Sequence, residues 1–215
     1  MSGRADASPR RRWWRRVLLP AAQDVPALLV IQGEHTADGM QAFAAWSHGG
    51  GHEAAVALNA ARDAAYDARR DLLKALQAAL STPVDQEDLY ILSERVDRVI
   101  NEARNTLREA EILKWAPDEH AGKMGARLAD GTSALIAGLA LLLKEPEAAG
   151  RKSDEASDAV HHMERDYREA MADLLKVEDL RAVLAAQDLY RRYVRVAEAI
   201  VQVTDRLWYS VLRGA

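Results

Sequence analysis

A stretch that begins with a proline break and becomes a long amphipathic pattern places the strongest constraint on the fold. Thr82-Pro83 ends a preceding helix, because proline lacks an amide hydrogen and bars the residue before it from the α region. Asp85 is a good N-cap, and Asp88 puts a carboxylate in the first turn, where the helix dipole favours it. Apolar residues then recur at steps of three and four: Leu89, Leu92, Val96, Val99, Ile100, Ala103 and Leu107. The stretch predicts a long helix with one buried face.

The same pattern returns near the end of the sequence. Gln187-Asp188-Leu189-Tyr190 matches Glu87-Asp88-Leu89-Tyr90, at a constant offset of 100 (188 against 88), which Ile200 and Leu207 continue. Upstream, Ala129-Asp130-Gly131 repeats Ala37-Asp38-Gly39 at an offset of 92 (129 against 37). Two echoes in the same order predict a duplicated unit. We expect repeat one at about 24–115 and repeat two at about 117–213.

The composition favours an all-helical protein. Only 12 glycines and 6 prolines occur among 215 residues, and there is no cysteine. Breaks and periodicity predict six long helices, arranged as two tandem three-helix bundles in an all-α fold without β-strands. The expected ranges are 24–46, 52–80, 85–115, 118–143, 154–175 and 180–213, with a loop at 145–150. The longest apolar run, 134–143, is too short to cross a bilayer.

The stretch Thr82-Pro83-Val84-Asp85-Gln86-Glu87-Asp88-Leu89 resembles the signature of the PhoU-like proteins associated with Pit-type phosphate transporters. More diffuse similarity covers 168–180 and the last helix, including 188–192, 197–200 and 205–208. The resemblance implies a single PhoU-like domain over 24–213. It also implies a non-enzymatic, cytoplasmic accessory protein that docks on a Pit-type transporter, peripheral to the inner face of the membrane.

PhoU-like proteins hold metal clusters with acidic motifs on their helices, so the resemblance also suggests a divalent or iron-type metal ion. Carboxylates four residues apart share a helix face and can grip one hard cation. The candidates here are Asp63, Asp67, Asp158, His162, Asp166, Glu198 and Asp205, with Asp154 extending the stripe on its helix. Of the other acidic family positions, Asp97 keeps its carboxylate, whereas Arg98, Asn101, Val201 and Gln202 depart from the pattern. Ordinary solvated helix faces and a residual metal site both stay open.

Residues 1–23 are expected to form a basic, flexible tail. Six arginines face one aspartate before Asp24, a balance of +5, so the overall charge of −4 leaves −9 for the remainder. The candidate contact residues are Arg10, Arg11, Arg12, Trp13, Trp14, Arg15 and Arg16. Arginines beside tryptophans suit an anionic membrane surface or an acidic partner. Alternatively, the tryptophans dock on the helical body. The acidic body disfavours nucleic acid.

No catalytic motif is present. The sequence has no Gly-x-Ser-x-Gly turn, no His-Glu-x-x-His helix and no phosphate-binding loop. Two functions therefore remain. The favoured one is the accessory protein of phosphate transport. The alternative is a metal-binding helical bundle with a carboxylate and histidine site and a storage or redox role. A homodimer would suit the alanine-rich helices.

Overall fold

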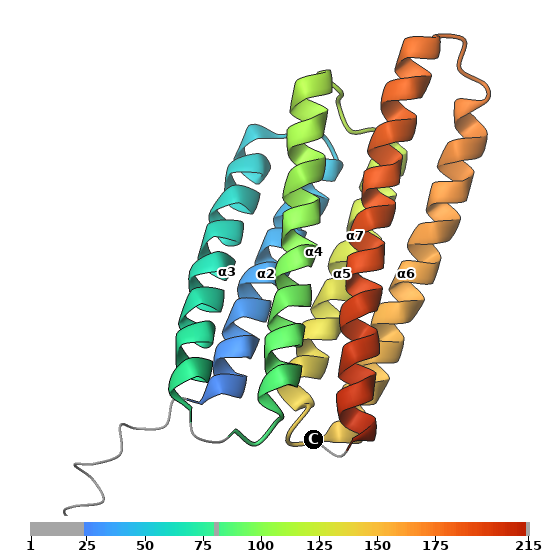
Figure 1. Cartoon of the computed structure of the whole chain (residues 1–215). Helices are drawn as coiled ribbons and strands as arrows, with labels where there is room; N and C mark the ends of the chain where they lie inside the picture. Colours follow the sequence, from blue (N-terminus) through green and yellow to red (C-terminus); the bar gives the residue numbers. More distant parts are fainter. Residues whose placement is uncertain (1–23, 80–81, 214–215) are drawn as a thin grey trace, which may run out of the picture.

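The structure is a computed structural model that describes residues 24–79 and 82–213, and this part of the chain contains six α-helices (Figure 1). They are α2 (Val25–Ser47), α3 (His52–Ala78), α4 (Gln86–Leu113), α5 (Glu119–Leu141), α6 (Pro146–Leu174) and α7 (Leu180–Leu212). None of the described residues lies in a β-strand. The predicted all-α class is confirmed.

The start of α6 differs from the prediction. Residues 145–150 were expected to form a loop, but α6 begins at Pro146 and continues through Gly150. Proline is tolerated in the first turn, because the amide that it lacks would have no partner inside the helix there. Gly150 has a packing role, since a Cβ added to it would lie 2.8 Å from the indole of Trp208 on α7. The predicted loop was therefore wrong.

Aspartate side chains cap four of the six helices. The N-caps of α2, α4, α5 and α7 are Asp24, Asp85, Asp118 and Asp179. Each carboxylate accepts a hydrogen bond from a backbone amide two or three residues further on, at 2.9–3.2 Å. The predicted N-cap at Asp85 is confirmed. The four caps begin the first and third helix of each predicted repeat, 94 residues apart in both cases (118 against 24, 179 against 85).

The helices pack in a pattern that repeats along the chain. Helix α2 packs against α3, α4 and α5, whereas α5 packs against α2, α6 and α7. Helix α4 also contacts α3 and α7, and α6 contacts α7. All three pairs within each predicted repeat are thus in contact, and α2–α5 and α4–α7 join the two halves (Figure 1). The two tandem three-helix bundles stay a prediction, with which these contacts agree.

Two glycines let α2 and α5 approach closely. A Cβ added to Gly33 would lie 2.9 Å from the side chain of Ile136. One added to Gly125 would lie 2.7 Å from Ser47 and 3.4 Å from the backbone of Ala44. These contacts are equivalent at the 92-residue offset, because Gly33 corresponds to Gly125 and Ala44 corresponds to Ile136. We call the surface around them the α2–α5 seam.

In the seam, one residue contacts the residue that corresponds to it in the other predicted repeat. The side-chain amide of Gln41 donates a hydrogen bond to the Ser133 hydroxyl at 3.3 Å, and the two residues are 92 apart. Equivalent positions meet in this way at an isologous interface, where a two-fold axis relates the two sides. The contact therefore favours an approximate two-fold relation between the predicted repeats.

Polar contacts join α4 to α7. Asp88, predicted only as a favourable first-turn carboxylate, is buried and binds Arg206 of α7. Further along the pair, Arg192 binds Glu109, and the amide side chain of Gln202 accepts a hydrogen bond from α4. Buried ion pairs tolerate the loss of one partner poorly, because the other charge is left without compensation. The α4–α7 contact is thus specified by charge as well as by apolar packing.

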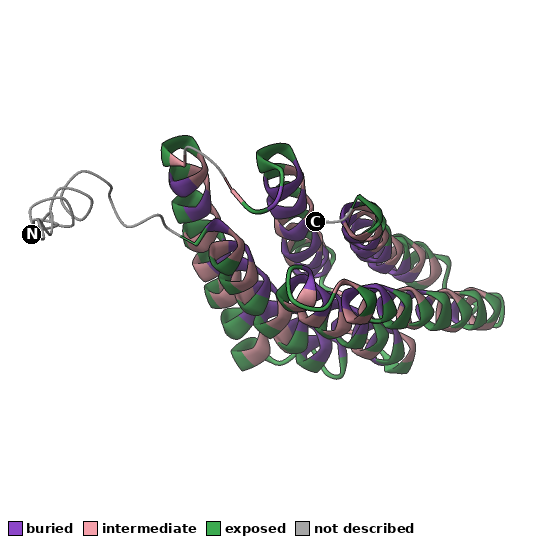
Figure 2. Ribbon diagram, turned by 90° about the horizontal axis from the view of Figure 1, so that it is seen from below, coloured by how far each residue is buried: buried purple, intermediate pink, exposed green. Residues whose placement is uncertain are grey.

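The apolar core is one contiguous cluster to which all six helices contribute. Figure 2 shows the buried residues facing between the helices and the exposed ones facing outward. Several polar groups within the core are paired, although the buried Ser153 hydroxyl has no hydrogen-bond partner among the described residues. Gln32 donates to the Ser93 carbonyl at 2.8 Å and accepts from the Ser93 hydroxyl at 2.6 Å, while the Ser47 hydroxyl lies 2.8 Å from the Tyr193 hydroxyl. Satisfied pairs of this kind fix the register of neighbouring helices.

Replacing Gly125 with alanine should lower the free energy of unfolding by about 1–2 kcal/mol. The added Cβ would displace Ser47, whose hydroxyl is held by Phe43 and Tyr193. This cost exceeds the helix propensity that alanine gains over glycine, roughly 1 kcal/mol. The matched control is Gly49→Ala, because nothing lies within 4 Å of a Cβ at that position. Urea denaturation followed by circular dichroism compares them, and equal losses would contradict a tight seam.

Candidate functional site

The residues predicted to bind metal on α3 face solvent. Asp63 lies 3.1 Å from Arg62 and Asp67 lies 3.4 Å from Arg70, so each carboxylate already has a cation beside it on its own helix. Within the described ranges, no group of three or more histidine, aspartate or glutamate side chains is placed to hold a metal ion. On α3 the two candidate carboxylates therefore lie on a solvent-exposed face, each beside an arginine of the same helix.

The predicted stripe on α6 is also not assembled into a site. Asp158 and His162 are exposed, and Asp166 turns toward α5, where its carboxylate lies 3.4 Å from the guanidinium of Arg127. The two candidates on α7 are exposed as well: Glu198 and Asp205. Residues four apart do share a face of α6, but the neighbouring helix presents a cation to that face. The hypothesis of a residual metal site gains no support from this arrangement.

Two arginines of α3 contact the part of α4 where the resemblance implies acidic residues. The carboxylate of Asp97 lies 3.3 Å from Arg69 and accepts a hydrogen bond from Asn101 at 2.9 Å. Arg62 in turn donates to the Asn101 side chain at 3.1 Å. Burial raises the pKa of Asp97, an effect that the charges of Arg69 and Arg62 oppose. This cluster ties α3 to α4.

Two buried tyrosines hold α7 against the other helices. The Tyr190 hydroxyl donates to Asp118, the N-cap of α5, and the Tyr193 hydroxyl meets Ser47 at the end of α2. Burial raises the pKa of both phenols above the ordinary value, most strongly for Tyr190, where Asp118 adds to the effect. Both hydroxyls therefore stay protonated at neutral pH and act as hydrogen-bond partners.

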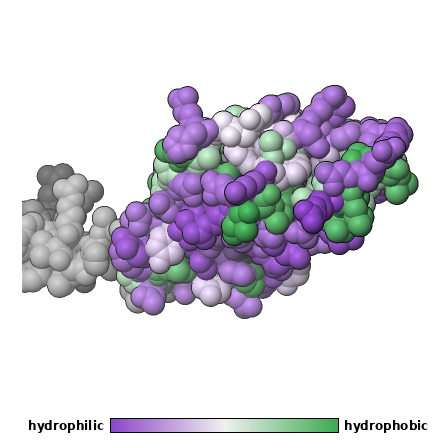
Figure 3. All heavy atoms as spheres, turned by 90° about the horizontal axis from the view of Figure 1, so that it is seen from above, coloured by the Kyte–Doolittle hydropathy of each residue, from purple (hydrophilic) through white to green (hydrophobic). Residues whose placement is uncertain are grey.

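Exposed apolar side chains gather at the connection between α6 and α7. This hairpin tip consists of Leu175, Val177, Leu180 and Leu184. Leu175 is 88% exposed, Leu180 68% and Leu184 55%. Figure 1 shows the connection projecting at one end of the molecule, and Figure 3, which looks onto that end, shows hydrophobic patches among hydrophilic surface. Grouped apolar residues on a surface mark interaction sites more often than single ones do.

Local sequence fixes the geometry of the hairpin tip. Asp179 caps α7, so the helix begins at Leu180, and Leu184 follows one turn later on the same side. Both leucines precede the first buried residue of α7, Ala186. Sequence analysis did not identify this surface, because it followed the buried stripe alone. The sequence does contain one sign of this surface, namely two leucines at the start of α7 that lie outside the buried stripe.

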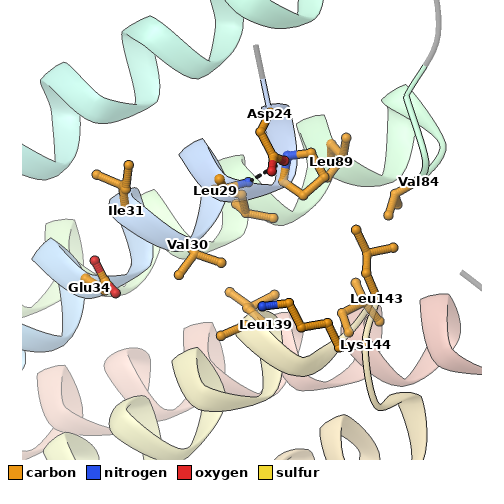
Figure 4. A pocket seen from close by; sticks show the side chains of 14 residues that line it. Asp24, Leu29, Val30, Ile31, Glu34, Val84, Leu89, Leu139, Leu143 and Lys144 are labelled. Atoms are coloured by element: carbon orange, nitrogen blue, oxygen red, sulfur yellow. Dashed lines mark hydrogen bonds between the residues drawn. The ribbon is translucent and has the colours of Figure 1, made fainter. Parts of the chain in front are cut away.

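A second apolar surface lies at the opposite end of the molecule. It is a groove of about 350 Å³ where α2 and α4 begin and α5 ends (Figure 4). Its apolar lining includes Leu29, Val30, Ile31, Leu139, Ala140 and Leu143. Three charged residues line it as well: Asp24, Glu34 and Lys144. We call it the α2–α5 groove.

The predicted membrane or partner contact lies outside the described residues, since Arg10–Arg16 precede Asp24. No helix within 24–79 and 82–213 combines the length and apolar character needed to cross a membrane. The hairpin tip and the α2–α5 groove are thus two apolar surfaces at opposite ends of the bundle, and the membrane contact of the arginine-rich segment stays a prediction.

Comparison with known proteins does not assign the chain to a family. No family model matches the chain, and no curated protein matches it significantly.

Proposed function

We propose that this chain is a non-enzymatic accessory protein of inorganic phosphate transport that docks on a Pit-type transporter at the cytoplasmic face of the membrane. Two things support the proposal. The stretch 82–89 resembles the PhoU-like signature, and the hairpin tip exposes a group of leucines with no partner among the described residues. The exposed tip is the observation that carries the proposal, because an accessory protein acts through the surface that it presents.

The hairpin tip is suited to binding a protein. It stands at the end of two long helices of 29 and 33 residues, whose packing against each other limits the loss of conformational freedom on binding. Fully burying a leucine side chain contributes about 1.5–3 kcal/mol, so three leucines can supply the apolar centre of an interface. Lys176, Glu178 and Arg181 lie beside them and provide the polar rim that gives specificity.

Such a protein regulates transport by occupying or releasing a transporter surface, and this requires no nucleophile or general base. The alternative function, a metal-binding bundle, has no comparable observation in its favour. Its candidate ligands on α3 and α6 face water or lie beside arginines. The charge of the body disfavours nucleic acid as a partner, because phosphates would be repelled.

Substituting both Leu180 and Leu184 with aspartate should reduce binding to the transporter by at least about tenfold, equivalent to ~1.4 kcal/mol. Folding should be affected little, because both side chains are largely exposed. The measurement is co-purification from detergent-solubilised membranes that contain the transporter. Val56→Asp, at a residue 53% exposed on α3, is the matched control and should bind normally.

Two outcomes of this experiment would count against the proposal. Failure of the unmodified chain to co-purify would remove the transporter as partner. Normal binding by the aspartate variant would remove the hairpin tip as the docking surface, while leaving the transporter itself in place.

The arginine-rich segment before Asp24 should bind anionic vesicles. Each cation near an anionic surface contributes about 1 kcal/mol, and the tryptophans suit the interface. Sedimentation with vesicles should show binding that rises with the fraction of anionic lipid, falls with added salt and is lost when residues 1–19 are removed. Equal binding by the truncated chain would place the membrane contact on the helical body instead.

A further inference from the structure

We propose that the segment Trp13–Leu19 docks in the α2–α5 groove of its own chain and is thereby held back from membranes. The groove would take the apolar side chains of this segment, and its acidic lining would face the arginines. This inference concerns one chain alone and does not depend on the identity of the transporter.

The groove is a preformed apolar surface. Ile31 is 41% exposed and Leu143 39% exposed, although both stand beside buried leucines. Figure 4 shows Val30 of α2 and Leu139 of α5 facing each other across the groove, with Leu143 beyond the end of α5. Concave apolar surfaces of about 300 Å³ or more are typical binding sites, so this groove of about 350 Å³ can accept large side chains.

The position of Asp24 makes the preceding segment the nearest occupant. Asp24 itself lines the groove, and Leu19 stands five residues before it. Five residues span at most about 18 Å and the ten residues back to Trp14 at most about 36 Å. A segment tethered this closely has a high effective concentration at the groove, in the millimolar range for short connections, which a separate molecule would not have.

Charge and hydropathy are complementary as well. The segment combines Trp13, Trp14, Val17, Leu18 and Leu19 with flanking arginines, and the residues before Asp24 carry a balance of +5. In the groove, the carboxylates of Asp24 and Glu34 outnumber the one ammonium group, that of Lys144. Exposed ion pairs contribute little each, so apolar contact would supply most of the binding and charge would orient the segment.

Docking and membrane attachment use the same side chains. Tryptophans and leucines that lie in the groove cannot also lie at a lipid interface, so one state excludes the other. The groove would therefore act as a competing site that weakens membrane binding, and anything that fills the groove would release the segment. A ligand shifts such an equilibrium only by its difference in affinity for the two states.

The absence of cysteine from the sequence permits a direct test by disulfide formation. Leu18→Cys is combined with Ala140→Cys, an exposed position in the groove, in the full chain without lipid. The control pairs Leu18→Cys with Ala78→Cys, an exposed position at the end of α3, at the same end of the molecule but outside the groove (Figure 1). Under mild oxidation, the groove pair should form an intramolecular disulfide at least about tenfold faster, as a high effective concentration requires.

Equal rates for the two pairs would overturn the proposal, since the segment would then visit this end of the bundle without docking. A disulfide that forms only between two chains would also overturn it, because the occupant would be a second copy. Electrophoresis without reductant and mass spectrometry distinguish these outcomes.

A second variant tests the competition with lipid. Leu143→Gln makes the groove polar without changing its charge, and the side chain is exposed enough for the fold to tolerate it. It should slow the Leu18–Ala140 cross-link in the cysteine variant by about tenfold, and on the natural background it should increase binding to anionic vesicles. Unchanged vesicle binding by a variant with reduced cross-linking would overturn the proposed restraint.

Discussion

The close approach of α2 and α5 is the contact on which the rest of the architecture depends. Gly33 and Gly125 remove the side chains that would otherwise hold the two helices apart. Because α3 and α4 pack on α2, and α6 and α7 pack on α5, the distance across this seam sets the relation of the two halves. That relation brings α4 beside α7, where Arg206 reaches the buried carboxylate of Asp88. A larger residue in the seam would disturb both contacts together.

Much of the fold could be predicted because the signals that begin and end helices are local. The aspartate at 85 and the apolar steps after it determine where α4 starts and which face is buried, whatever the remaining chain does. The sequence carries no comparable local signal for contacts between residues that are far apart along the chain. Asp88 looked like a first-turn carboxylate, and its partner lies 118 residues away. Proline at 146 is compatible with both a loop and a first helical turn, so the local sequence does not decide between them. In the structure this part of α6 is packed, with Ala149 buried and Gly150 against Trp208.

For the candidate sites, too, local sequence predicts positions on one helix but not contacts with other helices. A spacing of four residues states which side chains share a face of one helix, but not what the neighbouring helix presents to them. On α6, Asp166 meets Arg127, and on α4, Asp97 meets Arg69, so cations from neighbouring helices stand beside these carboxylates. The hairpin tip escaped prediction for the opposite reason. Its leucines matter because nothing in the described part of the chain covers them, and the absence of a neighbour cannot be read from one helix.

The arginines of the helical body and the arginines before Asp24 are expected to have different roles. Several arginines of the body bind acidic or amide groups across helix contacts, among them Arg69, Arg192 and Arg206. Guanidinium groups committed in this way attract an anionic surface weakly, and the net charge of the body is negative. Under the proposals above, attraction to lipid comes from the arginines that precede Asp24 in the sequence, and Asp24 itself lines an apolar groove together with Glu34. If the two proposals hold, the choice of those residues between the groove and a membrane decides where the body is held, and so which surfaces can reach the hairpin tip.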